Sequence, residues 1–145
     1  MHLVVDGMNV IGSRPDGWWR DRAGARRRLV ERLGALVGPQ RPVTVVFDGR
    51  PGAGERDGTA TNGVCVRFAP GGPNAADDLI VTLVGGASDG PPMTVITSDR
   101  TLVERIRRLG AEVESSSTLT ARLGWPDRSP GGEGAGRRRG RPRRG

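Results

Sequence analysis

Residues 1–7 read MHLVVDG, and residues 43–49 read VTVVFDG. Each stretch is a short apolar run rich in β-branched residues, and each closes on an Asp-Gly pair, which is a common turn signal. The runs are continuous and lack the in–out alternation of a half-exposed strand. They therefore predict two strands of a parallel sheet that is covered on both faces.

Further strands and helices are expected around this pair. The strands are a weak one at 64–68, one at 93–97 and a short one at 111–114. Apolar residues at three- and four-residue spacings predict helices at 21–37, 74–84 and 99–109, with a short last helix at 118–123. Alternating strands and helices predict an α/β domain with a mostly parallel sheet of four or five strands and helices on both faces.

The length of 145 residues suits one domain, expected at residues 1–125, followed by a basic tail at 126–145. Residues 50–62 follow the second strand, are rich in glycine and charge, and are expected to form a mobile loop. Residues 129–145 contain only Gly, Pro, Arg, Ser, Glu and Ala. Because such a segment cannot build a core, we expect it to be disordered.

The composition excludes several kinds of chemistry. All 23 basic residues are arginine, so a phosphate-loop lysine and a Schiff-base lysine are impossible. The only histidine, His2, is next to the start methionine, which disfavours a serine–histidine triad. The only cysteine, Cys65, rules out an internal disulfide and a cysteine-based zinc site. Neither a signal peptide nor a membrane-length apolar run is present, so the expected location is the cytoplasm.

The net charge of +7 is concentrated at the end of the chain. After residue 125 there are seven arginines and two acids, which gives +5, and the preceding part carries sixteen arginines and fourteen acids, which gives +2. The arginines around Arg138 are interpreted either as a non-specific RNA or ribosome anchor or as a dispensable extension.

The acidic residues show a positional pattern. Asp6, Asp48 and Asp99 each come directly after a predicted strand, and Asp77 and Asp78 lie in the first turn of the helix that follows the third strand. In an open α/β sheet, ligands bind beyond the carboxyl ends of the strands. A right-handed crossover starts its helix at that same edge. All five carboxylates are therefore expected at one edge of the sheet.

Carboxylates that lie close together repel one another unless they are protonated or neutralised by a cation. A hard divalent ion with oxygen ligands, Mg²⁺ or Mn²⁺, is the economical solution. Such an ion acidifies a water and stabilises the leaving oxygen of a phosphodiester, without any need for histidine or lysine. Asn9, three residues after Asp6, is positioned to orient Asp6 or to hydrogen-bond a substrate phosphate.

Each acid also has an ordinary structural interpretation. Asp77 forms a capping-box pattern with Asn74, Asp99 suits a helix cap, and Asp48 heads an Asp-Gly turn. Asn9 itself suits a turn. Caps do not explain why several strand ends carry Asp at one edge, and this joint occurrence favours the metal site.

Four motifs, DGMNVI at 6–11, VFDG at 46–49, ADDLI at 76–80 and TSD at 97–99, occur in this order. Together they resemble the NYN domain of the PIN-like ribonuclease superfamily, and in particular its compact YacP-like branch, over residues 1 to about 125. The resemblance implies a Rossmann-like sheet and metal-dependent cleavage of single-stranded RNA.

The resemblance also implies roles for particular residues. Asp6, Asp77 or Asp78, and Asp99 would be metal ligands, with Asp78 preferred where one of the pair must be chosen. Asn9 and Ser98 would support these ligands. Asp48 would lie in the second shell of the metal ion or at the periphery of the site.

Candidate RNA contacts are less specific. Arg50, Arg56 and Arg100 are close in sequence to the acidic edge and are the preferred candidates, together with Arg138 in the tail. The arginines between residues 22 and 32 suit a solvated helix face or a phosphate site. Trp18 and Trp19 suit covering the core or stacking on a base. The leading hypothesis is a metal-dependent endoribonuclease, and the alternative is an RNA-binding module of the same fold with weak or no nuclease activity.

Overall fold

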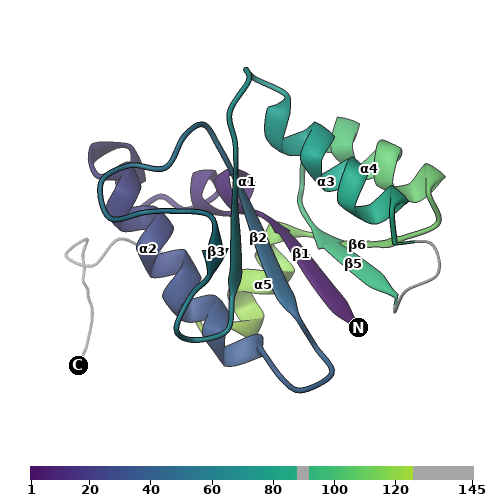
Figure 1. Cartoon of the computed structure of the whole chain (residues 1–145), viewed down its shortest axis with the longest axis horizontal. Helices are drawn as coiled ribbons and strands as arrows, with labels where there is room; N and C mark the ends of the chain where they lie inside the picture. Colours follow the sequence, from purple (N-terminus) through teal and green to yellow (C-terminus); the bar gives the residue numbers. More distant parts are fainter. Residues whose placement is uncertain (88–91, 126–145) are drawn as a thin grey trace, which may run out of the picture.

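The computed structural model describes residues 1–87 and 92–125. Its centre is a six-stranded sheet in the order β3-β4-β2-β1-β5-β6 (Figure 1). Every neighbouring pair is parallel except β3 and β4. The α/β class and the mostly parallel sheet are confirmed. The strands are β1 His2–Asp6, β2 Val43–Asp48, β3 Gly58–Thr59, β4 Cys65–Ala69, β5 Met93–Ile96 and β6 Glu112–Glu114.

The predicted strand count of four or five was too low because β3 was missed. This strand has two residues and lies inside the segment that was expected to be a loop without regular structure. It pairs only with β4, and a strand this short carries no pattern that distinguishes it from a loop.

Within the described residues, five α-helices surround the sheet. The predicted helix at 21–37 ends in α-form at Leu33 and continues as a 3₁₀ turn, Gly34–Leu36. The first helix was not predicted because it has only six residues and starts and ends with glycine. A second 3₁₀ turn is Trp18–Arg20. The helices are α1 Gly7–Gly12, α2 Arg22–Leu33, α3 Ala75–Gly85, α4 Arg100–Arg108 and α5 Ser116–Arg122.

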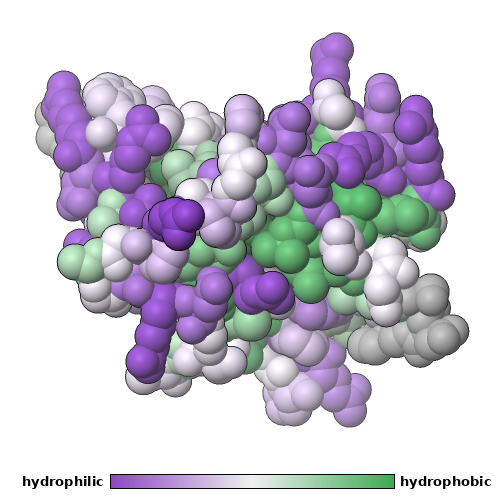
Figure 2. Space-filling view, turned by 45° about the horizontal axis from the view of Figure 1, so that its top comes forward, coloured by the Kyte–Doolittle hydropathy of each residue, from purple (hydrophilic) through white to green (hydrophobic). Residues whose placement is uncertain are grey.

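Successive strand residues face two separate cores. Leu3 and Val5 point into the core formed with α1, α2 and α5, whereas Val4 points into the core formed with α3 and α4. The two groups of helices lie on opposite sides of the sheet (Figure 1). Continuous apolar strands are thus explained by burial on both faces. Figure 2 shows a largely hydrophilic surface with one apolar area near the centre of that view.

Residues 50–62 are tied to the body of the domain at several points. Glu55 pairs with Arg26 of α2, the Asn62 amide donates to the Val30 carbonyl, and Asp57 accepts a hydrogen bond from the Phe68 backbone. These contacts hold the segment against α2 and β4, and its mobility stays a prediction. Glycine-rich composition does not reveal contacts made to a helix about 30 residues earlier.

The predicted basic tail, with its predicted disorder and Arg138, lies outside the described residues, and the division at residue 125 stays a prediction. Within residues 1–87 and 92–125, no helix is long and apolar enough to span a membrane.

Candidate metal site at the carboxyl edge of the sheet

The sheet topology gathers the carboxyl ends of β2, β1 and β5. These strands are parallel neighbours, with Asp6 opposite Val46 and Val5 opposite Ile96. Asp6 and Asp48 are the last residues of β1 and β2, and Asp99 follows β5 as the N-cap of α4. Helix α3, which carries Asp77 and Asp78, starts after β4. The predicted acids therefore lie at or next to one edge.

Asp6 is a buried carboxyl without a cation. Its residue is 5% exposed, and its Oδ2 accepts a hydrogen bond of 2.8 Å from the Thr97 hydroxyl. Burial raises the pKa of Asp6 to about 7, and repulsion from Asp77 and Asp48 adds to the rise, while the Thr97 hydrogen bond partly opposes it. Among the described residues, Asp6 makes no ion pair.

The two adjacent acids of α3 have different surroundings. Burial, followed by repulsion from Asp99 and Asp48, raises the pKa of Asp77. The Asp78 side chain is 64% exposed, and its Oδ1 lies 3.0 Å from Nη1 of Arg105 on α4. Neighbouring helix positions differ by about 100° in direction, so only one of the pair turns toward the other acids. The structure favours Asp77 over Asp78, opposite to the preference drawn from the sequence.

Asp99 and Asp48 both accept backbone hydrogen bonds from helix starts. Asp99 Oδ1 accepts from the Leu102 N–H at 3.1 Å, and Asp48 Oδ1 accepts from the Ala76 N–H at 3.3 Å. A carboxylate has about four lone-pair positions, so one capping bond leaves acceptor capacity for a cation. The capping and metal interpretations are therefore compatible. Asp48 also holds the start of the helix that carries Asp77.

Thr97 connects two of the acids and was missed as a site residue. Its hydroxyl donates to Asp6 and accepts from the Asp99 N–H at 3.1 Å. The residue is almost fully buried. The available signal was a threonine at the end of a buried strand, within the TSD motif and between two acids.

Asn9 and Ser98 belong to a hydrogen-bond network beside the acids. The Asn9 Oδ1 accepts from the Ser98 N–H at 2.8 Å and from the Ser116 hydroxyl at 2.7 Å. The Ser98 hydroxyl accepts from the Ser116 N–H at 3.0 Å. These bonds join α1, the loop after β5 and the start of α5. The Asn9 side-chain oxygen thus contacts serines, while the Asn9 backbone N–H donates to the Asp6 carboxyl. Ser116 is a member of this network that sequence reasoning missed.

The glycine of the first motif has a steric role. A Cβ at Gly7 would clash with the Phe47 ring. Glycine therefore lets α1 begin directly against β2, immediately after Asp6. In the second motif, Gly49 has φ +89°, a conformation that favours glycine.

The predicted RNA-contacting arginines are not gathered at one place. Arg50 and Arg100 are exposed and adjoin the acidic edge through Asp48 and Asp99, but neither forms an ion pair within the described part of the chain. Arg56 instead lines a separate pocket. Trp18 packs against the core, and Trp19 is 55% exposed.

Neighbouring acids are close enough to raise the pKa of Asp6 and of Asp77, but the acids do not form a complete ligand set. Among residues 1–87 and 92–125, no group of three or more His, Cys, Asp or Glu side chains is arranged to hold a metal ion. The donors still suit a hard divalent ion, because they are all carboxylate oxygens and repel one another without a cation.

The mostly parallel sheet and the acids at its carboxyl edge agree with the expectation drawn from the four sequence motifs. A family model for the YacP-like NYN domain matches residues 3–128, and the chain belongs to this family. The resemblance drawn from the four sequence motifs is thereby confirmed.

Solved structures agree with this assignment. A crystal structure of Rae1 (YacP) from Bacillus subtilis is 28% identical, has a TM-score of 0.69, and covers 86% of this chain and 74% of that chain. A point mutant of the same protein is 26% identical, has a TM-score of 0.68, and covers 85% and 74%. No curated protein matches the chain.

Proposed function

We propose that this chain is a Mg²⁺- or Mn²⁺-dependent endoribonuclease that hydrolyses phosphodiester bonds of single-stranded RNA at the acidic edge. Membership of a nuclease family supports the general activity. The observation that carries the proposal is the state of Asp6, which is buried, faces other acids and has a pKa raised to about 7. Perturbed acids of this kind cluster at functional sites.

Asp6, Asp77 and Asp99 are the residues that would hold the ion. When bound, the ion supplies an acidified water and positive charge at the leaving oxygen. Thr97 positions two of these residues by bonding the Asp6 carboxyl and the Asp99 backbone. Asp48 fixes the start of α3 and, through it, Asp77. Asp78 is assigned to the surface pair with Arg105.

Arg50 and Arg100 are the cations that would bind RNA phosphates beside the acids. Both are exposed, and each lies within two residues of an acid of the edge. Guanidinium groups match phosphate oxygens in geometry and charge. Association with the ribosome and a role for Arg138 remain part of this proposal.

The test is cleavage of a labelled single-stranded RNA by the full chain with Mn²⁺ or Mg²⁺ and with EDTA. Wild type is expected to cleave only with the metal. Asp6→Asn and Asp99→Asn are expected to lose activity by at least about 100-fold, which is more than the loss expected when a residue that only orients a metal ligand is removed. Glu104→Gln, an exposed acid of α4, is the control and should retain activity. Absence of cleavage by wild type, or equal cleavage by all variants, would contradict the proposal.

One observation favours the alternative of an RNA-binding module. Within the described ranges, no three acids already form a ligand arrangement. A binding module would retain RNA affinity in EDTA and show no metal-dependent product at any protein concentration. The same cleavage assay therefore separates the two functions.

A further inference from the structure

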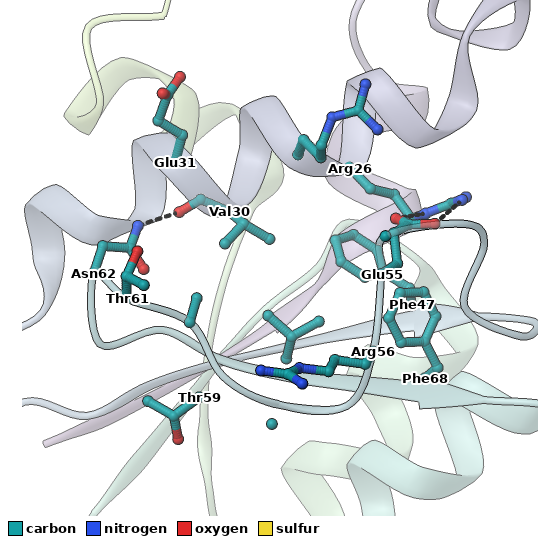
Figure 3. Close-up of a pocket in the computed structure, with 15 residues that line it drawn as sticks. Arg26, Val30, Glu31, Phe47, Glu55, Arg56, Thr59, Thr61, Asn62 and Phe68 are labelled. Carbon is teal, nitrogen blue, oxygen red and sulfur yellow. Dashed lines mark hydrogen bonds and ion pairs between the residues drawn. The ribbon is translucent and has the colours of Figure 1, made fainter.

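A pocket of about 510 Å³ lies between α2 and residues 54–62, away from the acids described above (Figure 3). Its volume is within the range of about 300–1,000 Å³ typical of small-ligand sites. None of the proposed metal ligands lines it.

Hydrogen bonds at two places join the walls of the pocket. At one end, Arg26 donates two hydrogen bonds of 2.7 Å to the Glu55 carboxylate. At the other end, the Asn62 Nδ2 donates to the Val30 carbonyl at 2.9 Å. Figure 3 shows these ties on opposite sides of the cavity. The walls are therefore fixed before a ligand arrives, which reduces the entropy lost on binding.

The charge on the pocket walls favours an anionic ligand. Arg26 is neutralised by Glu55. Arg27 and Arg56 also line the pocket and are exposed, and their guanidinium groups form no hydrogen bond or ion pair within the described residues. Glu31 is the remaining acid of the lining, and its carboxylate points away from the cavity in Figure 3. Two arginine side chains are thus available for phosphate oxygens.

The interior of the pocket differs from a simple anion site. Val30, Val66 and Phe68 supply apolar surface, and Thr61 supplies a hydroxyl without a hydrogen-bond partner among the described residues. A ligand that satisfies the whole lining has a flat apolar part with polar edges and an attached anion. A nucleotide with an unpaired base has this chemistry, whereas a free phosphate leaves the apolar surface uncovered.

The pocket lies beside the end of β2 that also carries an acid of the edge. Phe47 contributes to the pocket lining, and the next residue, Asp48, lies at the edge. Successive residues of a strand face opposite sides of the sheet, so the Phe47 side chain faces the pocket and the Asp48 carboxylate faces α3 on the other side. An RNA strand that reaches both sites would pass around the end of β2. From this placement we propose that the pocket binds one unpaired nucleotide of the RNA, with the base inside and its phosphate on Arg27 and Arg56. The proposal rests on the proposed ribonuclease function and names a specificity site for it.

The test measures binding of a fluorescein-labelled single-stranded 10-nucleotide RNA to the full chain in EDTA, by fluorescence anisotropy at several salt concentrations. The double variant Arg27→Gln/Arg56→Gln is expected to bind about 10-fold or more weakly, since each arginine loses a charge-assisted hydrogen bond. The slope of log affinity against log salt should become shallower by about 0.7 for each phosphate that the variant no longer neutralises.

Arg28→Gln/Arg108→Gln is the matched control, because both residues are exposed, lie outside the pocket lining, and remove the same charge. It is expected to weaken binding by less than about 3-fold. Ala60→Phe fills the pocket without changing charge and should weaken binding like the arginine double variant. Thermal unfolding of each variant checks that the domain remains folded.

Two results would overturn the nucleotide site: equal losses of affinity in the pocket and control double variants, or wild-type affinity in the folded Ala60→Phe variant. Failure of the ribonuclease proposal gives a different pattern, in which wild type shows no metal-dependent cleavage while the binding differences persist. A wild-type chain that binds no RNA in this assay contradicts the pocket proposal directly.

Discussion

Two buried carboxylates of this domain, Glu55 and Asp6, have opposite electrostatic surroundings. The Glu55 side chain is 7% exposed, and the hydrogen bonds from Arg26 lower its pKa. Asp6 is more deeply buried, and this burial together with the neighbouring acids raises its pKa to about 7. The Glu55 carboxylate is neutralised by Arg26, whereas no cationic side chain among the described residues pairs with Asp6.

This difference shows that the lack of a partner at Asp6 is not a general property of the chain. The sequence contains 23 arginines, and the fold places one of them beside Glu55. Within the described part of the chain, none forms an ion pair with Asp6, Asp48, Asp77 or Asp99. This difference supports the proposal that the acidic edge binds a divalent cation.

The largest expected effect distinguishes the two adjacent acids of α3. Asp77→Asn should reduce RNA cleavage by about 100-fold or more, because it removes a proposed ligand. Asp78→Asn should change cleavage by less than about 3-fold, since it removes only an exposed pair with Arg105 that contributes about 0–1 kcal/mol. Single-turnover cleavage with Mn²⁺ measures both, and equal reductions would contradict the assignment.

A second comparison concerns the hydroxyl that joins Asp6 and Asp99. Thr97→Val should reduce cleavage by about 10–100-fold, the usual effect of removing a partner that orients a ligand. Thr94→Val is the control, because Thr94 is also buried on β5 but bonds to Met1 instead of an acid. Similar cleavage by the two variants would show that Thr97 has only a packing role.

A third prediction uses the pH dependence of stability in the metal-free protein. As pH rises, the unfolded state releases the Asp6 proton near its ordinary pKa of 3.8, whereas the folded state retains it until about 7. Wild type should therefore lose stability between about pH 4 and pH 7, with no further loss from this group above that range.

Asp6→Asn lacks this loss. In EDTA at pH 8, its free energy of unfolding should exceed that of wild type by roughly 2–4 kcal/mol, and the difference should shrink toward pH 4. Urea denaturation of both proteins at pH 5 and pH 8 measures the change. A difference that does not depend on pH would contradict the raised pKa.

The smallest effect is expected for a substitution of Glu55, the carboxylate that pairs with Arg26. Glu55→Gln should lower the free energy of unfolding by about 1–3 kcal/mol, because it weakens the two hydrogen bonds from Arg26 and leaves that cation poorly paired. Chemical denaturation at pH 7 checks this, with Glu104→Gln as the exposed control. An unchanged or increased stability would mean that the Arg26 pair does not hold residues 50–62 in place.

The elements of the fold that could be predicted from the sequence are those with a clear local pattern. Strands β1, β2 and β5 are apolar runs that end in a clear polar turn, so local pattern was sufficient. Helix α1 and strand β3 were missed because they are too short for a period and depend on tertiary contacts. The tie between Arg26 and Glu55 joins residues 29 positions apart and has no local signature.

The candidate site was predictable to a similar extent. The positions of Asp6, Asp48 and Asp99 followed from strand ends and sheet topology. The proposed choice of Asp77 over Asp78 did not follow from the sequence, because it depends on the phase of α3 and on Arg105 from a later helix. The bridging role of Thr97 depends on two hydrogen bonds that form only in the folded sheet.

The most direct test of the central claim is to locate Mn²⁺ by its anomalous scattering in crystals of the full chain. We predict a Mn²⁺ peak with carboxylate oxygens of Asp6, Asp77 and Asp99 at about 2.1–2.2 Å, and loss of this peak in Asp77→Asn. Saturating Mn²⁺ with no peak at this edge, or with a peak at Glu55 instead, would contradict the claim that the unpaired acids are kept for a metal ion.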